Sequence, residues 1–507
     1  MMPRPLRFLP LAASLMSLLG CAVGPDYHPP AQNAPAAFAA APAGPSAAID
    51  PARWWRALGD AELDALVEQA VVANPDIAIG LTRLQAAQAQ EAVLLGLTLP
   101  ELDAAYAAAK GTGSDASRGR VPSPLTSADN SSVLPGKQIQ QIGGFAGFWE
   151  IDLFGRYRRA IEAGIYDAEA AAEVRHQLLV TVIADLVRTY VDLRGLQTSL
   201  AVLRQDIAAA ESSRDFVALR YQRGLTNELD LTLAERELSS LRAELAPLTA
   251  RIEAARYAIA SLVGRFPEEL DRSLTSARPI PALPESIAPG LPLDLLQRRP
   301  DIRESERRLA AATARIGVAT GNLFPRIALA GAAGAQFAAI GTDNGNHIWS
   351  LGPAAYWPLL DFGALDAQID IADFRSQEQL LLYKRTVLNA VREVDSAVSA
   401  FAAQQDNVKN LGDALLQAQR AVTLAKERYD RGLTDFLNVV DAERRQYGLE
   451  SQVIAAQQAA AEDFAALFKA LGGGWEDYRA TPPVRLPQPA ILAMFSRLAA
   501  ASQGEER

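Results

Sequence analysis

The chain of 507 residues contains two copies of one long sequence unit. Residues 220–236 and 428–444 are identical at ten of 17 positions, at an offset of 208 residues. Phe148-Trp149 and Tyr356-Trp357 share this offset. Solenoid repeats are only about 20–50 residues long. The larger offset therefore indicates that a whole structural half was duplicated, and we expect both halves to fold alike.

A second offset locates a loop and a linker. Residues 75–77 match residues 300–302 at an offset of 225, so the first copy is longer by 17 residues before its Phe-Trp pair. That interval contains 111–136, which is rich in Ser, Gly, Pro and Asn and predicts a loop. We divide the chain into a signal peptide (1–20), an extended lead (21–53), a first repeat (54–266), a Pro-rich linker (267–292), a second repeat (293–475) and a C-terminal tail (476–507).

Each half begins with a helix and two strands. Asp60 is a candidate N-cap for a helix over 62–96, and the second copy is expected to begin its helix near Leu293. Segments 99–109 and 139–151 predict one strand pair, and segments 325–337 and 349–360 predict another. Their Ala, Gly, aromatic and aliphatic residues alternate only loosely. Each segment is long enough for a tilted membrane strand of about 9–11 residues.

A very long helical stretch follows in each half. Segments 156–223 and 364–431 contain no proline, and at 1.5 Å per residue each predicts a rod of roughly 100 Å. Apolar residues step three and four apart inside both rods, which is the spacing of a coiled coil. They are Leu200, Leu203, Ile207 and Ala210 in the first copy, and Val408, Leu411, Leu415 and Ala418 in the second.

Both rods end at the same four residues, Arg-Gly-Leu-Thr. Gly224 and Gly432 are expected to terminate the helices, because glycine adopts the left-handed conformation of a helix C-terminus. A second helix is expected to return from each turn. Its N-cap is predicted to be Thr226 or Asn227 in the first copy, and Thr434 or Asp435 in the second.

The N-terminus has the pattern of a processed export signal. Two arginines precede a short apolar stretch that is too short to cross a bilayer. Leu18-Leu19-Gly20-Cys21 resembles a bacterial lipobox, and Cys21 is the only cysteine of the chain. The resemblance implies cleavage before Cys21, attachment of lipid to it, and sorting to the outer membrane because Ala22 follows. The alternative is an ordinary secretion signal with a chance cysteine near its end.

Charge and apolar patterning restrict the partners. A net charge of −10 and a pI near 5.1 argue against binding nucleic acid, which requires basic patches. No stretch after the signal approaches 18 consecutive apolar residues, so any membrane crossing would need a closed β-barrel. Four strands are fewer than the minimum of about eight in single-chain barrels. Several copies would then close one barrel; the alternative is that the strands belong to a soluble domain.

The ordered set of motifs resembles the outer membrane factor (TolC-like) family, in its NodT-type lipoprotein branch. These motifs are Gly24-Pro25-Asp26-Tyr27, Trp54-Trp55, Asn74-Pro75-Asp76, residues 148–156 (FWEIDLFGR), Arg298-Arg299-Pro300-Asp301-Ile302 and the two Arg-Tyr-x-Arg-Gly-Leu-Thr turns. They extend over residues 21–475, nearly the whole mature chain.

The resemblance implies a mixed α and β membrane protein, the internally duplicated protomer of a homotrimer. Its outer-membrane β-barrel would have twelve strands, continued by a long periplasmic α-helical barrel. It also implies that small molecules pass from an inner-membrane pump of the RND type through a periplasmic adaptor and this tunnel to the exterior.

The resemblance also implies a periplasmic gate near the second turn. Asn438 and Asp441 match positions of acidic or polar pore rings, although Asn438 departs from the doubly acidic pattern of some members. Tyr429 and Arg444 match positions that brace neighbouring helices in the closed state. A trimer would place three Asp441 carboxylates around one axis, which predicts a cation-attracting constriction. The alternative for Asp441 is a favourable charge near a helix N-terminus, worth about 0.3–1 kcal/mol.

Catalytic and cofactor functions find little support. The three histidines, His28, His176 and His347, lack metal-ligand spacing. The glycine run 472–474 lacks the Lys-Ser/Thr of a phosphate loop. No cofactor is expected beyond the covalent lipid on Cys21. The main alternative to a channel is a structural or adaptor lipoprotein with coiled-coil rods and no pore; an extracytoplasmic enzyme is the second.

Overall fold

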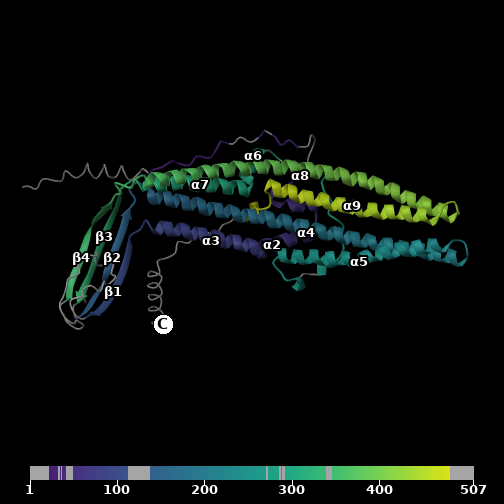
Figure 1. The fold of residues 1–507 in the computed structure, drawn as a ribbon, viewed down its shortest axis with the longest axis horizontal. Helices are drawn as coiled ribbons and strands as arrows, with labels where there is room; N and C mark the ends of the chain where they lie inside the picture. Colours follow the sequence, from purple (N-terminus) through teal and green to yellow (C-terminus); the bar gives the residue numbers. More distant parts are fainter. Residues whose placement is uncertain are drawn as a thin grey trace, which may run out of the picture.

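The computed structural model describes residues 22–31, 35, 37–40, 49–111, 138–269, 272–284, 287, 290, 292–337 and 345–479. Cys21, the signal peptide and most of the predicted tail lie outside the described residues, and so does most of the predicted loop at 111–136. The described chain consists of a β-sheet, a long layer of helices and two helical hairpins that extend away from the sheet (Figure 1).

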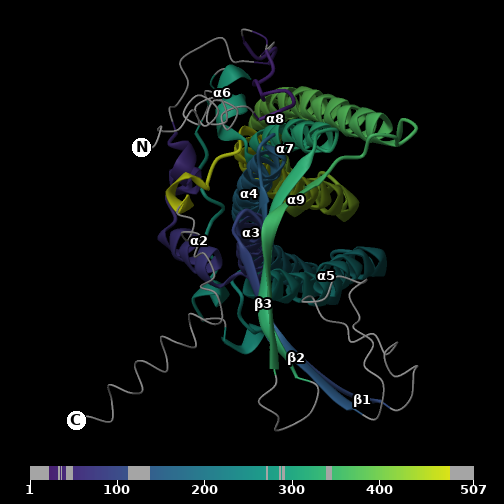
Figure 2. The ribbon, with the colours of Figure 1, turned by 90° about the vertical axis from the view of Figure 1, so that its left-hand side faces the viewer.

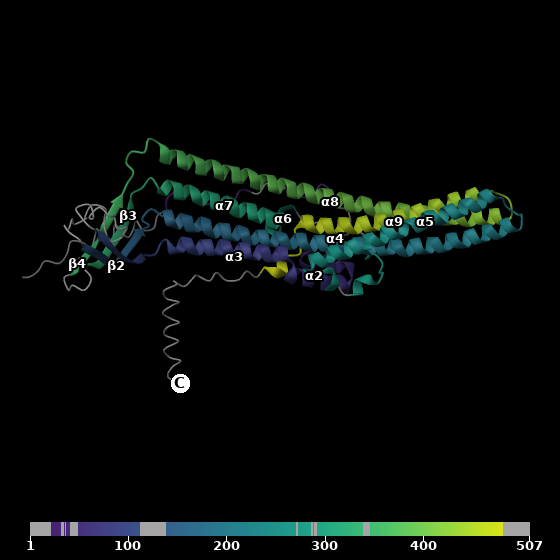
Figure 3. The ribbon, with the colours of Figure 1, turned by 60° about the horizontal axis from the view of Figure 1, so that its bottom comes forward.

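Two helices of 67 residues each dominate the molecule. They are α4 (Arg156–Gln222) and α8 (Ala364–Asp430), and both confirm the predicted rods to within one residue at each end. Helix α5 (Glu228–Leu262) returns along α4, and α9 (Phe436–Leu471) returns along α8. Figure 3 shows the two hairpins lying side by side, with their turns at the end opposite the sheet.

The predicted coiled-coil spacing corresponds to real packing. Leu203 and Ala210 of α4 are buried against Leu238 and Leu241 of α5, with Ile207 packed beside them. The equivalent residues of α8 are only half-buried. The coiled-coil seam of α4 is therefore more completely buried than that of α8.

The four strands form one antiparallel sheet in the order β1-β2-β3-β4. The strands are β1 (Glu101–Gly111), β2 (Gln138–Ile151), β3 (Arg326–Phe337) and β4 (Gly345–Tyr356). Strands β2 and β3 join the two repeats, with Gly144 opposite Gly334. A Cβ on Gly144 would lie 2.4 Å from the carbonyl oxygen of Ala333, so only glycine fits there. The outer edges of β1 and β4 have no neighbouring strand within the described chain.

The predicted helix over 62–96 is wrong in one respect, because it is broken in two. Helix α2 (Ala61–Ala73) ends at Asn74, and α3 (Pro75–Gly96) begins directly after it. Proline disfavours helical conformation in the residue before it. The Asn74 side chain accepts hydrogen bonds from the backbone N–H groups of Asp76 and Ile77 at 2.8 and 3.2 Å. The predicted Asp60 cap is confirmed, since its carboxylate accepts from the Glu62 N–H at 2.9 Å.

The second repeat is broken at the corresponding place. Helix α6 (Pro292–Arg298) and helix α7 (Pro300–Gly321) are separated at Arg299. The Arg299 side chain is buried and donates to the Ala470 carbonyl at 2.8 Å and to Glu393 at 2.9 Å. The break thus fastens the start of α7 to both helices of the second hairpin.

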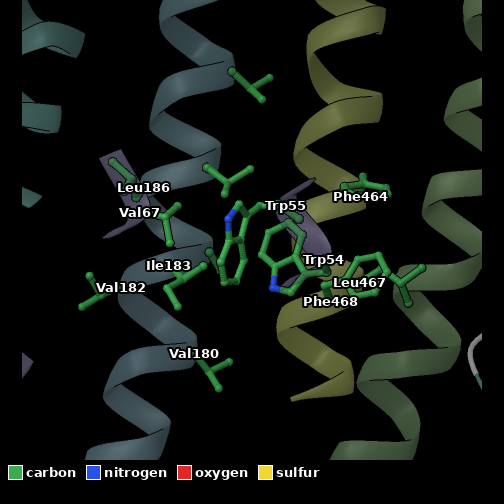
Figure 4. Close-up of a cluster of buried hydrophobic side chains, with 14 of the residues drawn as sticks. Trp54, Trp55, Val67, Val180, Val182, Ile183, Leu186, Phe464, Leu467 and Phe468 are labelled. Carbon is green, nitrogen blue, oxygen red and sulfur yellow. The ribbon is translucent and has the colours of Figure 1, made fainter. Parts of the chain in front are cut away.

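The main hydrophobic core lies midway along the rods, where the short helix η1 (Pro51–Leu58) meets α2, α4 and α9. Trp54 is 1% exposed and stacks on Phe468 with ring centroids 5.2 Å apart. Figure 4 shows Trp54 and Trp55 between Ile183 of α4 and the phenylalanines of α9. Several of the chain's few aromatic residues therefore gather where the two repeats meet.

The predicted lead is extended but it is not free of the fold. The N–H of Val23 donates to the Phe154 carbonyl at 3.0 Å, and the Tyr27 hydroxyl donates to Glu306 at 3.2 Å. Gly24 lies against Gly317, where a Cβ on Gly24 would come within 2.3 Å of backbone. Figure 1 shows this lead as a purple trace along α7 and α8. The motif at residues 24–27 is thus a docking segment for the surface of the helices.

The linker between the repeats also packs onto the core. It contains the short helices η3 (Pro267–Glu269) and η4 (Arg272–Thr275), and Leu274 and Ile287 are buried. A last short helix, η5 (Glu476–Tyr478), lies beyond the predicted end of the second repeat. It is held to the molecule by an ion pair of 2.5 Å between Asp477 and Arg53. Among the described helices, none combines the length and apolar composition that crossing a membrane requires.

Candidate functional site at the helical tip

The two helical turns are built alike. Gly224 and Gly432 adopt φ angles of 69° and 72°, and each ends its rod. In both turns the following leucine N–H donates at 2.9 Å to the carbonyl five residues earlier, Leu225 to Arg220 and Leu433 to Arg428. This is the Schellman arrangement, in which a left-handed glycine allows the last carbonyls of a helix to be satisfied.

The two returning helices are capped differently. In the first repeat the Asn227 side chain accepts from the Asp230 N–H at 3.0 Å, and the Thr226 hydroxyl bonds to the Asp230 carboxylate. In the second repeat Asp435 occupies the N-cap without a side-chain cap bond. The Thr434 hydroxyl there accepts from the Asn438 amide at 2.8 Å. The second turn is therefore the less firmly capped.

Tyr429 lies between the two hairpins. Its ring is 6% exposed, and its hydroxyl is 3.4 Å from both Thr226 and Asp230 of the first hairpin. Burial is the main cause of a raised pKa for Tyr429. The guanidinium of Arg220 lies over the same ring at 4.9 Å from its centroid. These contacts link the end of α8 to the first turn.

Arg444 makes a second link between the hairpins, farther from the turns. Its Nε donates at 2.6 Å to the buried carboxylate of Glu237 on α5. Glu443, the neighbouring residue, is buried as well and lies 2.8 Å from Lys426 of α8. Tyr429 and Arg444 are therefore both placed where the first and second repeats meet.

Asp441 and Asn438 are separate from these links. Both are exposed, and the Asp441 carboxylate is 59% exposed and pairs with Arg445 at 3.0 Å. Leu233, the counterpart of Asp441 in the first copy, packs instead against the small apolar cluster around Tyr429 and Phe436. The two copies thus use this position differently. The assignment of Asp441 to a gate stays a prediction.

A pair of acids between the hairpins, one buried and one half-buried, was not predicted from the sequence. Asp206 of α4 is 9% exposed and hydrogen-bonds to Glu450 of α9, with Glu244 of α5 nearby. Burial, and then the charge of Glu450, raise the pKa of Asp206 to about 7. Tyr447 lies beside Asp206 and Glu450, and its pKa is raised by burial and then by nearby carboxylates, of which Glu443 has the largest effect. The sequence feature that could have indicated this pair is Asp206 itself, an acidic residue directly before Ile207 of the predicted coiled-coil seam.

Exposed leucines at the tip were also missed. Leu225 and Leu229 in the first repeat, and Leu433 and Leu437 in the second, are each about 60% exposed. Leu433 corresponds to Leu225, and Leu437 to Leu229, at the same offset of 208 residues. Solvent-exposed leucines repeated at the end of two hairpins indicate an apolar contact surface.

His176, which lies in the described core, makes packing and hydrogen-bond contacts of a structural kind. His176 stacks on Trp475 at 4.3 Å and its Nδ1 lies 3.1 Å from Glu173. Over the residues that the structure describes, no three His, Cys, Asp or Glu side chains group as a metal site would require.

The chain matches the family model described as outer membrane efflux protein over residues 66–265 and 291–473. It is 31% identical to the outer membrane protein OprJ of Pseudomonas aeruginosa, with 92% of this chain and 95% of that protein covered. Nodulation protein T of Rhizobium leguminosarum bv. viciae is 29% identical, with coverage of 95% and 96%.

Solved structures agree with these relatives. The outer-membrane channel OprN superposes with a TM-score of 0.80 at 34% identity, covering 90% of this chain and all of that one. A membrane protein from Pseudomonas aeruginosa gives a TM-score of 0.78 at 28% identity, with coverage of 90% and 98%. These similarities favour the channel over the pore-free coiled-coil alternative. The chain belongs to the outer membrane efflux protein family, and it is an outer-membrane channel component of an efflux system that extends into the periplasm.

Proposed function

We propose that three copies of this chain close one twelve-stranded barrel in the outer membrane, continued by a tunnel of helices through the periplasm. The observation that supports this most strongly is the sheet itself. Its four strands leave the outer edges of β1 and β4 without neighbours in the described chain. An unpaired strand edge in lipid costs several kcal/mol per unsatisfied group. Pairing β4 of one copy with β1 of the next removes every such edge at once.

The exposed apolar residues of the sheet support the same assembly. Leu102, Phe145, Trp349 and Leu351 are large, apolar and more than half exposed, and they line one hollow of the sheet surface together with Leu329. Such a patch is unfavourable in water, and lipid is the environment that suits it. A lipid chain on Cys21 would hold the lead at the same membrane.

The distal partners in this proposal are a periplasmic adaptor and an inner-membrane pump of the RND type. The exposed leucines of both turns offer the adaptor an apolar contact surface at the tip that faces the inner membrane. Small molecules would pass from the pump through the adaptor and the tunnel to the exterior. No nucleic acid and no cofactor besides lipid enters this proposal.

The test of the assembly uses purified full-length protein in detergent. We expect sedimentation to give three chains per particle, and reconstitution into a planar bilayer to give discrete current steps. Protein that remains monomeric, or a trimer that never conducts at any voltage, would contradict the proposal. A trimer without conductance would favour the pore-free lipoprotein.

Asp441 is proposed to form the cation-attracting ring at the tip. Three carboxylates around one axis should bind a multivalent cation, although each Arg445 at 3.0 Å weakens the ring. We expect Asp441→Ala to raise the half-blocking concentration of hexaamminecobalt(III), added on the helical side, by about tenfold, or 1.4 kcal/mol. Single-channel recording measures the block.

Asp435→Ala is the matched control for the ring. Asp435 is exposed in the same turn and makes no side-chain cap bond. Its removal should change the block less than twofold. Equal effects of both substitutions would show that general surface charge attracts the cation, and an unchanged block in Asp441→Ala would exclude Asp441 from the constriction.

A further inference from the structure

A cavity of about 720 Å³ lies on the helical layer beneath the sheet. Helix α3 packs on α4, α4 on α7, and α7 on α8, and the cavity is lined by residues of all four helices. Small side chains, including the buried Ala170 and Ala312, line part of it. The volume falls in the range of about 300–1,000 Å³ typical of small-molecule sites.

The charged residues of this cavity are mostly arginines. Arg83, Arg308, Arg315 and Arg375 contribute four positive charges, against the negative charges of Asp167 and Glu378. When Glu304, the ion-pair partner of Arg308, is counted as well, one positive charge remains in excess, in a chain whose net charge is −10. The four arginines come from three different helices. We call them the arginine belt.

Two members of the belt are not neutralised. Arg315 pairs with Asp167, and Arg308 pairs with Glu304 at 2.5 Å. For Arg83 and Arg375, no carboxylate of the described chain lies within ion-pair distance. Both are exposed, and each lies on one of the two outermost helices of the layer. Their guanidinium groups are therefore available to a ligand.

The face of the layer that holds the belt is opposite to the docked lead. On α7, the lead contacts Glu306 and Gly317. Arg308 and Arg315 follow Glu306 by two and nine residues, which at 3.6 residues per turn places them about 180–200° around the helix. In the proposed assembly the lead descends from a lipid anchor outside the barrel, so the face of the helices that it covers is the outer one. The face with the belt is thus the inner one, and Figure 2 shows these helices curving as an arc.

From this geometry we infer that the belt is a binding station for small organic anions inside the channel, such as aromatic carboxylates or sulfonates. This inference depends on the proposed trimer, which would bring six unpaired belt arginines, Arg83 and Arg375 of each copy, around one lumen. Guanidinium groups bind carboxylate and sulfonate oxygens through paired hydrogen bonds, and the small apolar side chains accept an aromatic body. A narrow lumen lined by one sign of charge concentrates ligands of the opposite sign.

The belt lies at the opposite end of the tunnel from Asp441. Its members are six to 13 residues from the helix ends next to the sheet, or roughly 10–20 Å below it. An anion that has passed the acidic tip would therefore meet positive charge just before it enters the barrel. The channel would favour anionic cargo at this step.

The experiment measures the binding of pyranine, an aromatic trisulfonate, to purified full-length protein in detergent by fluorescence anisotropy. We expect saturable binding that is weakened by salt. Arg83→Gln/Arg375→Gln should weaken it by at least about tenfold, equivalent to 1.4 kcal/mol. Arg392→Gln is the matched control, because Arg392 is on α8, 66% exposed and lines neither neighbouring cavity.

Binding that is equal in the wild type and the double variant would overturn the inference, and so would equal loss in Arg392→Gln. Sedimentation of the same samples separates this result from the proposed assembly. If the protein is a trimer that does not bind pyranine, the binding station is refuted and the proposed assembly stands. If the protein is a monomer that does not bind pyranine, both proposals are refuted. Circular dichroism of the double variant should match the wild type, since both arginines are exposed.

Discussion

Replacing Arg194 by alanine should destabilise the fold by about 3–5 kcal/mol, because it leaves a buried partner charge without compensation. The Arg194 side chain is completely buried in α4. It donates to Gln197 at 2.7 Å, to the Ser276 carbonyl at 2.8 Å and to the Tyr190 hydroxyl at 2.9 Å. It also forms an ion pair with Glu62 at the start of α2.

Removal of the guanidinium would leave the Glu62 carboxylate, whose side chain is 11% exposed, with the more distant Arg278 at 3.4 Å as its remaining ion-pair partner among the described residues. Guanidinium titration followed by circular dichroism measures the loss. Glu62→Gln should recover part of it in the double variant, because the two residues are directly coupled.

Arg188→Ala is the control on the same helix. Arg188 is 51% exposed and its nearest carboxylate, Glu462, is 4.0 Å away, so its loss should cost at most about 0.5 kcal/mol. If Arg194→Ala destabilised the protein no more than Arg188→Ala, the buried network would contribute nothing to stability.

The sequence was informative where the physical signal is local and repeated. Proline-free stretches with coiled-coil spacing determined the extent of α4 and α8, because each turn of a helix obeys the same rule. Gly224 and Gly432 marked the turns, because only glycine adopts the left-handed conformation easily. Because the chain is duplicated, each pattern occurs twice. The weakly patterned strands could therefore be located to within a few residues of their bounds in the structure.

Features that depend on distant segments were not predictable in this way. The Arg194 network joins α2, α4 and the inter-repeat linker, and nothing in the sequence around Arg194 indicates Glu62 or Ser276 as partners. The lead was expected to be extended, but its docking depends on Gly24 meeting Gly317 across the fold. The break at Asn74 was predictable in principle, since a proline follows an N-capping residue there.

The helical tip contains both predictable and unpredictable features. Tyr429 and Arg444 came from the family resemblance, and the structure gives each a partner in the first hairpin. The acidic pair of Asp206 and Glu450 could not be found, because the two residues are 244 positions apart in sequence. Asp206 also differs from an ordinary residue of a coiled-coil seam, because burial and the like charge of Glu450 both raise its pKa.

This pair should make the stability of the hairpins depend on pH between about 4 and 7. Burial and the charge of Glu450 raise the pKa of Asp206 from 3.8 to about 7. In this window the folded chain holds a proton that the unfolded chain releases. The stabilisation is fully present below the unfolded pKa and is lost as the pH rises through the folded pKa. The shift alone corresponds to at most roughly 4 kcal/mol, which solvent screening reduces to about 2 kcal/mol per protomer.

Asp206→Asn should remove this dependence, because an amide can still hydrogen-bond to Glu450 and carries no charge. The variant should be more stable than the wild type by less than about 1 kcal/mol at pH 5 and by about 2 kcal/mol at pH 8, measured by guanidinium titration at both values. Asp215→Asn controls for the substitution itself, since Asp215 is on the same helix, 70% exposed and paired with Arg214. A wild type whose stability rises from pH 5 to 8, or an Asp206→Asn variant that follows the wild type, would show that Asp206 is ionised in the folded protein.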